Sequence, residues 1–347
     1  MARQSNLNLL GVSAFCESLG MMIQSGIDLN EAMSLLKQKK DSGILSEKID
    51  VMEKCLSEGS SLKQAMEKAG SFPEYAIAMV EAGENTGKLE EVLFKLAHYY
   101  HKQDRISSKI STALTYPLIM LLMIIAVLLI MLKMVLPAFT GIYQTLAGSL
   151  SESSFAYINY AYAFCKIVLI VAVVIVVAGL ICYFLYKGKG KKTVEKILRL
   201  DPNCARLLDD LAMYRFTAAY EVYLSSGYMQ DEALNSACAM ADYEPAEARL
   251  KKCREIMDEG RGFAYSANEA QLYEPIYGKM LIPAERSGNT EDTLAHLSDL
   301  LSDDAADRVE VITGKMESIL SGVMMLSIGI ALLSVMLPLI GIMNSIG

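Results

Sequence analysis

Two of the three histidines in this 347-residue chain, His98 and His101, stand three positions apart. On a helix this spacing places both imidazoles on one face, where they could offer two ligands to a metal ion. No pattern for a third ligand accompanies them, and Tyr99, Tyr100 and Lys102 lie among them. We therefore expect the pair to belong to an amphipathic helix rather than to a metal centre.

A run of acidic residues near the end of the chain is the second candidate for chemistry. Its members, at helical spacing, are Asp299, Asp303, Asp304, Asp307 and Glu310. Like charges one helical turn apart repel by a few tenths of a kcal/mol. A divalent cation or a basic partner could compensate for that repulsion. A solvated helix face is the simpler interpretation.

The remaining candidates also lack the spacing that their chemistry needs. The seven cysteines contain no C-x-x-C pair, which is typical of reduced thiols on the cytoplasmic side. Segments 83–88 and 188–193 combine glycine with lysine, but neither has the G-x-x-x-x-G-K-[ST] order of a phosphate-binding loop. With no nucleophile–base set and no cofactor fingerprint, we expect a protein that is not an enzyme and binds no cofactor.

The composition points to a membrane protein. Hydrophobic residues make up 53% of the chain and charged residues only 21%, which is more apolar than an ordinary soluble domain. Three segments, 116–137, 166–187 and 318–342, are long enough to cross the roughly 30 Å of a bilayer core as helices. Lys133 interrupts the first of them near its end, where a lysine can extend its ammonium to the interface.

Charged residues around these segments predict the orientation. The first residues lack the apolar core of a signal peptide, so we expect the N-terminus to lie in the cytoplasm. The loop 138–165 carries a single charge, Glu152, and is expected outside together with the tail 343–347. The second span is followed by a basic cluster that should be cytoplasmic and that suits anionic lipid: Lys187, Lys189, Lys191 and Lys192.

The sequence repeats itself at an offset of 201 residues, which places Phe15 on Phe216 and Glu84 on Glu285. One gap-free offset covers a polar region and the span behind it, so we infer a duplicated domain. The matched glycines are expected to be structural turns, and the matched prolines to mark the ends of spans one and three. These residues are Gly26 and Gly227, Gly87 and Gly288, and Pro137 and Pro338.

Each copy has the pattern of a helical bundle. Apolar residues recur at helical spacing, Ser61 and Gln64 predict a capping box, and 83–87 is expected to be a turn before a helix that runs into the membrane. The predicted fold is all-α, with two homologous cytoplasmic helical bundles of about six helices each, at 1–115 and 188–317, and three transmembrane helices.

The balance of charge bears on partners. The net charge of −8 argues against nucleic acid as a partner. Most of the excess acid lies in the second copy, which suggests either that the two copies meet different partners or that the second is simply more soluble.

Several stretches resemble one known family. Segments 15–32 and 82–93 are similar to its opening motif and to its most distinctive stretch, here AGENTGKLEEVL, and Pro117 and Pro137 fit the ends of its first span. On these residues the chain is identified as a member of the type II secretion system F family, the GspF/PilC-like inner-membrane platform proteins. The second copy matches less well, since Tyr228 and Met229 replace the Ile-Asp of the first.

The resemblance implies a platform beneath a growing filament in secretion, type IV pilus or competence machines. Its implied partners are a hexameric cytoplasmic assembly ATPase, pilins or pseudopilins, the lipid bilayer and further copies of itself as a dimer or higher oligomer. Two alternatives stay open. One is an oligomeric transporter or channel that uses Lys133 and the few serines of the third span. The other is a membrane-bound enzyme with a metal at His98 and His101 or at the acidic run.

Overall fold

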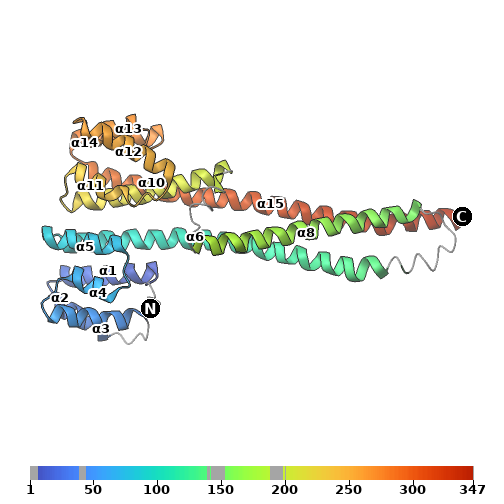
Figure 1. Ribbon diagram of the computed structural model, residues 1–347, viewed down its shortest axis with the longest axis horizontal. Helices are drawn as coiled ribbons and strands as arrows, with labels where there is room; N and C mark the ends of the chain where they lie inside the picture. The colour runs from blue at the N-terminus through green and yellow to red at the C-terminus, as the bar shows by residue number, and fades with distance from the viewer. Residues whose placement is uncertain are drawn as a thin grey trace. The chain divides into compact units, whose positions relative to one another are not determined.

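The computed structural model describes residues 7–38, 44–138, 141, 153–187, 198–199 and 201–346. Within these residues the secondary structure is helical and contains no strand, which confirms the predicted all-α class (Figure 1). The chain divides into two compact units. One comprises Met1–Lys109 with Arg206–Asp307, and the other Ile110–Ala205 with Arg308–Gly347.

The first unit contains both copies of the duplicated domain. The first copy is formed by α1 (Leu9–Gln24), α2 (Leu29–Gln38), α3 (Ile44–Ser57), α4 (Leu62–Ala69), α5 (Glu74–Thr86) and the beginning of α6 (Leu89–Ile130). The second is formed by α10 (Pro202–Ser225), α11 (Gln230–Cys238), α12 (Glu244–Asp258), α13 (Phe263–Glu269), α14 (Pro275–Ser287) and the beginning of α15 (Thr290–Ile346). Each copy therefore has the six helices that its sequence predicts.

Equivalent residues form the two cores. Phe15 on α1 is buried and its ring lies 5.0 Å from that of Phe72. Its counterpart Phe216 on α10 is also buried and stacks on Tyr220, which in turn contacts Phe263. Aromatic residues bury large apolar areas and favour such offset or tilted contacts. The first helix of each copy is thus fixed to its bundle by an aromatic residue at the same position of the repeat.

The local helix signals are mostly as predicted. Ser61 caps α4, and Gln64 completes the capping box in both directions. The prediction of a turn over 83–87 is wrong, because α5 continues to Thr86 and only Gly87 leaves the helix, with φ +70°. Gly83 lies within α5 and permits a close approach of the next helix, since a Cβ there would lie 3.1 Å from the Cα of Leu89.

In its described residues the second unit contains three helical segments long and apolar enough to cross a membrane. They lie in α6, in α8 (Ser153–Lys187) and in α15. The end of the first is a π-helical turn, η1 (Met131–Val135), and the hydroxyl of Tyr162 on α8 donates to the carbonyl of Leu132 at 2.8 Å. A small core surrounds Cys165, and its other buried members are Ile124 and Leu128 on α6, Leu132 on η1, and Leu136 just after it.

The bundles and spans are joined without a break in the helix. The domain boundaries expected at 115 and 317 fall inside α6 and α15, which run from the first unit into the second. Pro117, which cannot donate a backbone hydrogen bond, lies inside α6 in the part that belongs to the second unit.

Candidate functional site

The four glycines singled out by the repeat all adopt left-handed backbone conformations. Gly26 has φ +78° and its counterpart Gly227 has φ +92°, while Gly87 and Gly288 have φ +70° and +74°. A side chain is disfavoured in this region, so each helix can end there at little cost with glycine. We expect these residues to act as turns of the scaffold.

The other predicted site residues are less informative. Pro137 lies in the exposed part of the helical turn that follows η1. Pro338 falls within α15 and Lys187 is the last residue of α8, but the side chains of both lie outside the described residues. Lys189, Lys191 and Lys192 lie outside the described residues altogether.

The structure does not bring the histidines and the acidic run together as a metal site. His98 faces Asp299, with 3.7 Å between Nε2 and a carboxylate oxygen, and His101 is exposed. Asp304 instead accepts a hydrogen bond from the hydroxyl of Tyr277 at 2.7 Å. Among the residues that the structure describes, no three His, Cys, Asp or Glu side chains are placed to hold a metal ion.

What the structure does reveal is a row of lysines that ties the first copy to the second. The row consists of Lys88, Lys95, Lys102 and Lys109, each seven residues from the next. Seven residues are nearly two helical turns, so Lys95, Lys102 and Lys109 follow one face of α6, and Lys88 immediately precedes that helix. We call these four residues the lysine row.

Three members of the lysine row contact the second copy directly. The Lys88 ammonium donates to the carbonyl of Ser225, the last residue of α10, at 2.8 Å. Lys95 forms an ion pair with Glu221 on α10 at 2.7 Å, and Lys102 forms one with Asp299 on α15. Since a helix C-terminus carries partial negative charge, all three acceptors are anionic in character.

The ion pair of Lys95 and Glu221 is the most buried of these contacts. The Glu221 side chain is only 11% exposed and that of Lys95 25%. Burial raises the pKa of Glu221, and the attraction of the Lys95 ammonium offsets that effect only in part. For Lys95, burial lowers the pKa, but the charges and hydrogen bonds of Glu221 and of Glu91, 3.2 Å away on α6, together outweigh burial and leave the pKa raised. Each charge at this position depends on its partner.

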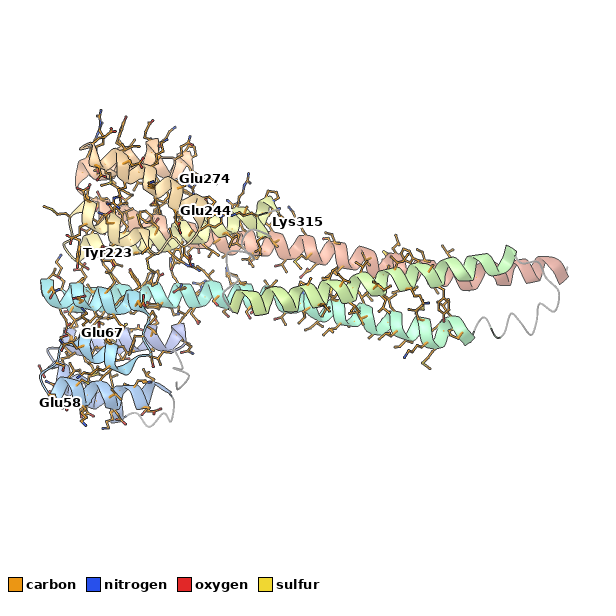
Figure 2. All side chains as sticks on the ribbon, viewed as in Figure 1. Glu58, Glu67, Tyr223, Glu244, Glu274 and Lys315 are labelled. Atoms are coloured by element: carbon orange, nitrogen blue, oxygen red, sulfur yellow. The ribbon has the colours of Figure 1, made fainter. Side chains whose placement is uncertain are left out.

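Aromatic residues line the same contact. The ring of Tyr99 on α6 stacks on that of Tyr214 on α10, with 6.1 Å between centroids. Tyr75 on α5 meets Tyr223, labelled in Figure 2, edge to face at 6.4 Å. A cavity of about 320 Å³ opens beside the Tyr99–Tyr214 stack, and the lysine row lines it at Lys95 and Lys102.

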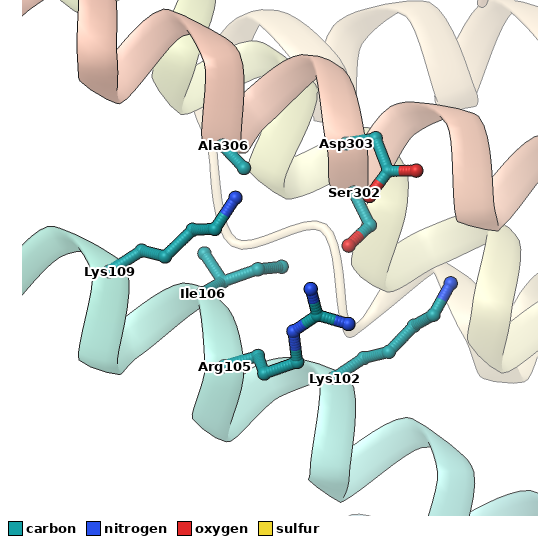
Figure 3. A pocket seen from close by; sticks show the side chains of 7 residues that line it. All are labelled: Lys102, Arg105, Ile106, Lys109, Ser302, Asp303 and Ala306. Atoms are coloured by element: carbon teal, nitrogen blue, oxygen red, sulfur yellow. The ribbon is translucent and has the colours of Figure 1, made fainter.

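A smaller hollow continues along the same face of α6. Lys102, Arg105 and Lys109 extend from α6 toward Ser302 and Asp303 of α15 (Figure 3). Its volume of about 20 Å³ is room for a single water molecule. Lys109, the last member of the row, lines this hollow together with residues of the second copy.

Glu84, which stands out in the sequence only because it matches Glu285 in the repeat, caps the N-terminus of a helix. The carboxylate of Glu84, at the end of α5, accepts from the backbone N–H groups of Leu62 at 2.7 Å and Lys63 at 3.2 Å. Glu285 does the same for Ala264 at the start of α13, at 3.3 Å. The presence of a glutamate at the same position of both copies was the sequence feature that could have pointed to this capping role.

The duplicated positions of the lysine row are not basic. At the offset of 201 residues its counterparts are Asn289, which immediately precedes α15, and His296, Asp303 and Glu310 on α15. All four are exposed. The two copies share one fold, but only the first carries the cationic face.

Comparison with known proteins agrees with the duplication. A family model described as "Type II secretion system (T2SS), protein F" matches residues 15–137 and again residues 217–338. The chain is 23% identical to "Type IV pilus assembly protein PilC" of Myxococcus xanthus, over 96% of this chain and 81% of that protein. It is 21% identical to the PilC of Pseudomonas aeruginosa, over 99% and 96%. The "Type II secretion system protein F" of Aeromonas hydrophila is 21% identical, over 94% and 85%.

Proposed function

The chain belongs to the type II secretion system protein F family, and we propose that it is the inner-membrane platform of a type IV pilus, type II secretion or competence pseudopilus machine. The observation that carries this proposal is the double match of the family model, since each match takes in one bundle and the apolar helix behind it. Relatives that cover almost the whole chain are named for pilus assembly and for type II secretion.

In this role the chain performs no chemical step itself. We propose that it couples a hexameric cytoplasmic assembly ATPase to the extraction of pilins or pseudopilins from the membrane, working as a dimer or higher oligomer. The continuity of α6 and α15 from bundle to span supports such coupling, because no loop separates each bundle from the apolar segment behind it.

We propose that both bundles lie in the cytoplasm, with the N-terminus inside and the C-terminus outside. The ion pairs of Lys95 with Glu221 and of Lys102 with Asp299 support a common side, because a bilayer cannot lie between groups in contact. The second span then returns the chain to the cytoplasm before the second copy begins.

The orientation can be tested by labelling with a membrane-impermeant maleimide. Cysteines replace exposed Glu67 on α4 and exposed Glu255 on α12, and a third variant carries one in segment 142–152. In intact spheroplasts only the third should be labelled, and all three after lysis, with the modified residues identified by peptide mass spectrometry. Labelling of Glu67→Cys and Glu255→Cys from opposite sides would refute the arrangement.

The function itself is tested by deletion and capture. A strain without this chain should lose its surface or periplasmic filaments, and the wild-type gene should restore them. The detergent-solubilised protein should retain a hexameric ATPase and pilins. Normal filaments in the deletion strain would overturn the proposal, and solute flux through proteoliposomes that contain only this chain would favour a transporter instead.

A further inference from the structure

We infer that the contact between the two copies is a latch, in which the lysine row of α6 engages and releases the second copy while both bundles stay folded. The inference goes beyond the platform role, because it concerns a movement between the two copies within one chain. It can be tested on the purified protein without filament or ATPase. Three features of the contact carry it.

The first feature is the kind of bond that holds the copies together. Lys88, Lys95 and Lys102 reach across on long, flexible side chains to a helix C-terminus and two carboxylates. These polar contacts can form and break without repacking the core of either bundle, and the attraction between partly exposed charges is screened by salt. The rings of Tyr99 and Tyr214 also stack across the contact, so separation of the copies exposes some aromatic surface. The cores of the two copies, by contrast, are closed by aliphatic and aromatic residues within each copy.

The second feature is incomplete packing. An open cleft of about 320 Å³ lies beside the stacked Tyr99 and Tyr214, and charged side chains of both copies line it, among them Lys95 and Glu221. The hydroxyls of Tyr75 and Tyr99 are buried at this contact and have no hydrogen-bond partner in the described part of the chain. Because a buried polar group without a partner is costly, separation of the copies would let water satisfy both.

The third feature is that the contact is one-sided. The counterparts of the row in the second copy, from Asn289 to Glu310, contain no lysine and are exposed. The first copy therefore supplies the cations and the second supplies their acceptors at Glu221 and Asp299. This arrangement gives the duplicated domain a single defined closed state rather than two equivalent ones.

The test uses a cysteine that is covered only while the latch is closed. Ala218 on α10 lines the cavity, is 8% exposed, and differs from cysteine only by a sulfur atom. The full-length protein with Ala218→Cys is treated with N-ethylmaleimide in detergent, and modification of position 218 is followed by peptide mass spectrometry. If opening is fast and reversible, the rate is proportional to the open fraction.

Modification of position 218 should become faster when the latch is weakened. Raising the salt from about 0.05 M to about 0.5 M should increase the rate several-fold. Lys95→Glu, which sets two carboxylates against each other, should increase it about 30-fold or more. The charge swap Lys95→Glu with Glu221→Lys should return it toward the parent rate.

Native cysteines and a matched variant separate the latch from unfolding. Cys16 and Cys253 are completely buried in the first and second copies and should stay unmodified throughout. Lys63→Glu breaks the ion pair of Lys63 with Glu81 inside the first copy and changes the charge by the same amount. It should leave position 218 at the parent rate.

Three results would overturn the latch. One is equal modification of position 218 in Lys95→Glu and Lys63→Glu. Another is modification of Cys16 in step with position 218, because that would mean unfolding of the bundle. The last is a rate in the parent Ala218→Cys protein that does not change with salt, a measurement that requires no charge variant to fold.

Discussion

Replacing Glu84 by glutamine tests whether this carboxylate caps α4, and whether it stabilises its helix more than Glu285 stabilises α13. Both carboxylate oxygens of Glu84 accept backbone N–H groups at the start of α4, from Leu62 and Lys63. In Glu84→Gln one oxygen becomes an NH₂ group that faces an N–H donor, and the charge at the helix N-terminus is lost. Glu285 in the second copy makes a single, longer bond of 3.3 Å to Ala264.

The expected magnitude follows from these bonds. A hydrogen bond to a charged group contributes about 1.5–3 kcal/mol, and Glu84 is partly exposed, so we expect Glu84→Gln to destabilise the start of α4 by about 2 kcal/mol. That corresponds to about a 30-fold rise in local opening. Glu285→Gln should cost about 1 kcal/mol at the start of α13, or roughly a five-fold rise.

Hydrogen exchange measured by mass spectrometry on the full-length protein provides the readout. Peptides that cover 58–70 report the cap of α4, and peptides that cover 259–271 report the equivalent cap of α13. Each variant serves as the control for the other, since Glu84→Gln should leave the second copy unchanged. Equal effects at the two caps, or no change in exchange at Leu62 and Lys63 in Glu84→Gln, would refute the assignment.

Three further changes test other parts of the structure. Gly87→Ala places a side chain at φ +70° and should destabilise the first copy by about 1–2 kcal/mol, measured as faster exchange at the end of α5; unchanged exchange would contradict the left-handed assignment. Burial raises the pKa of Cys16 to about 12, so its thiol should resist iodoacetamide at about pH 8 until the protein is denatured, and rapid native modification would show that it is accessible. Tyr162→Phe removes the bond to the Leu132 carbonyl and should lower the thermal midpoint in detergent by an amount that corresponds to about 1 kcal/mol, whereas an unchanged midpoint would mean that η1 does not depend on that hydroxyl.

Features set by local sequence were the ones that could be predicted. The all-α fold, the six helices per copy and the capping box of Ser61 follow from patterns within a few residues of each other. The error over 83–87 has a local cause as well. Two glycines in five residues indicate a turn, but Gly83 serves close helix contact with Leu89, a role that only the three-dimensional packing makes visible.

Features that join distant parts of the chain were missed for a physical reason. The target of Glu84 lies 22 residues earlier, and the partner of Lys95 lies 126 residues later. Neither separation produces a periodic pattern. The lysine row did leave a signal, since four lysines spaced by seven mark one helical face, but amphipathic helices carry such faces toward solvent as often as toward a partner. Only the structure distinguishes the two.

Duplication explains why the lysine row matters more than any single ion pair in it. If two identical bundles met through the same face, like charges at matched positions would repel. In the second copy, Asp303 stands in place of Lys102 and Glu310 in place of Lys109, which removes this repulsion. The two copies therefore carry opposite charges at these equivalent positions. The excess acid of the second copy, which from sequence alone suggested either different partners or greater solubility, has a third role: it supplies acceptors for the first copy at Glu221 and Asp299.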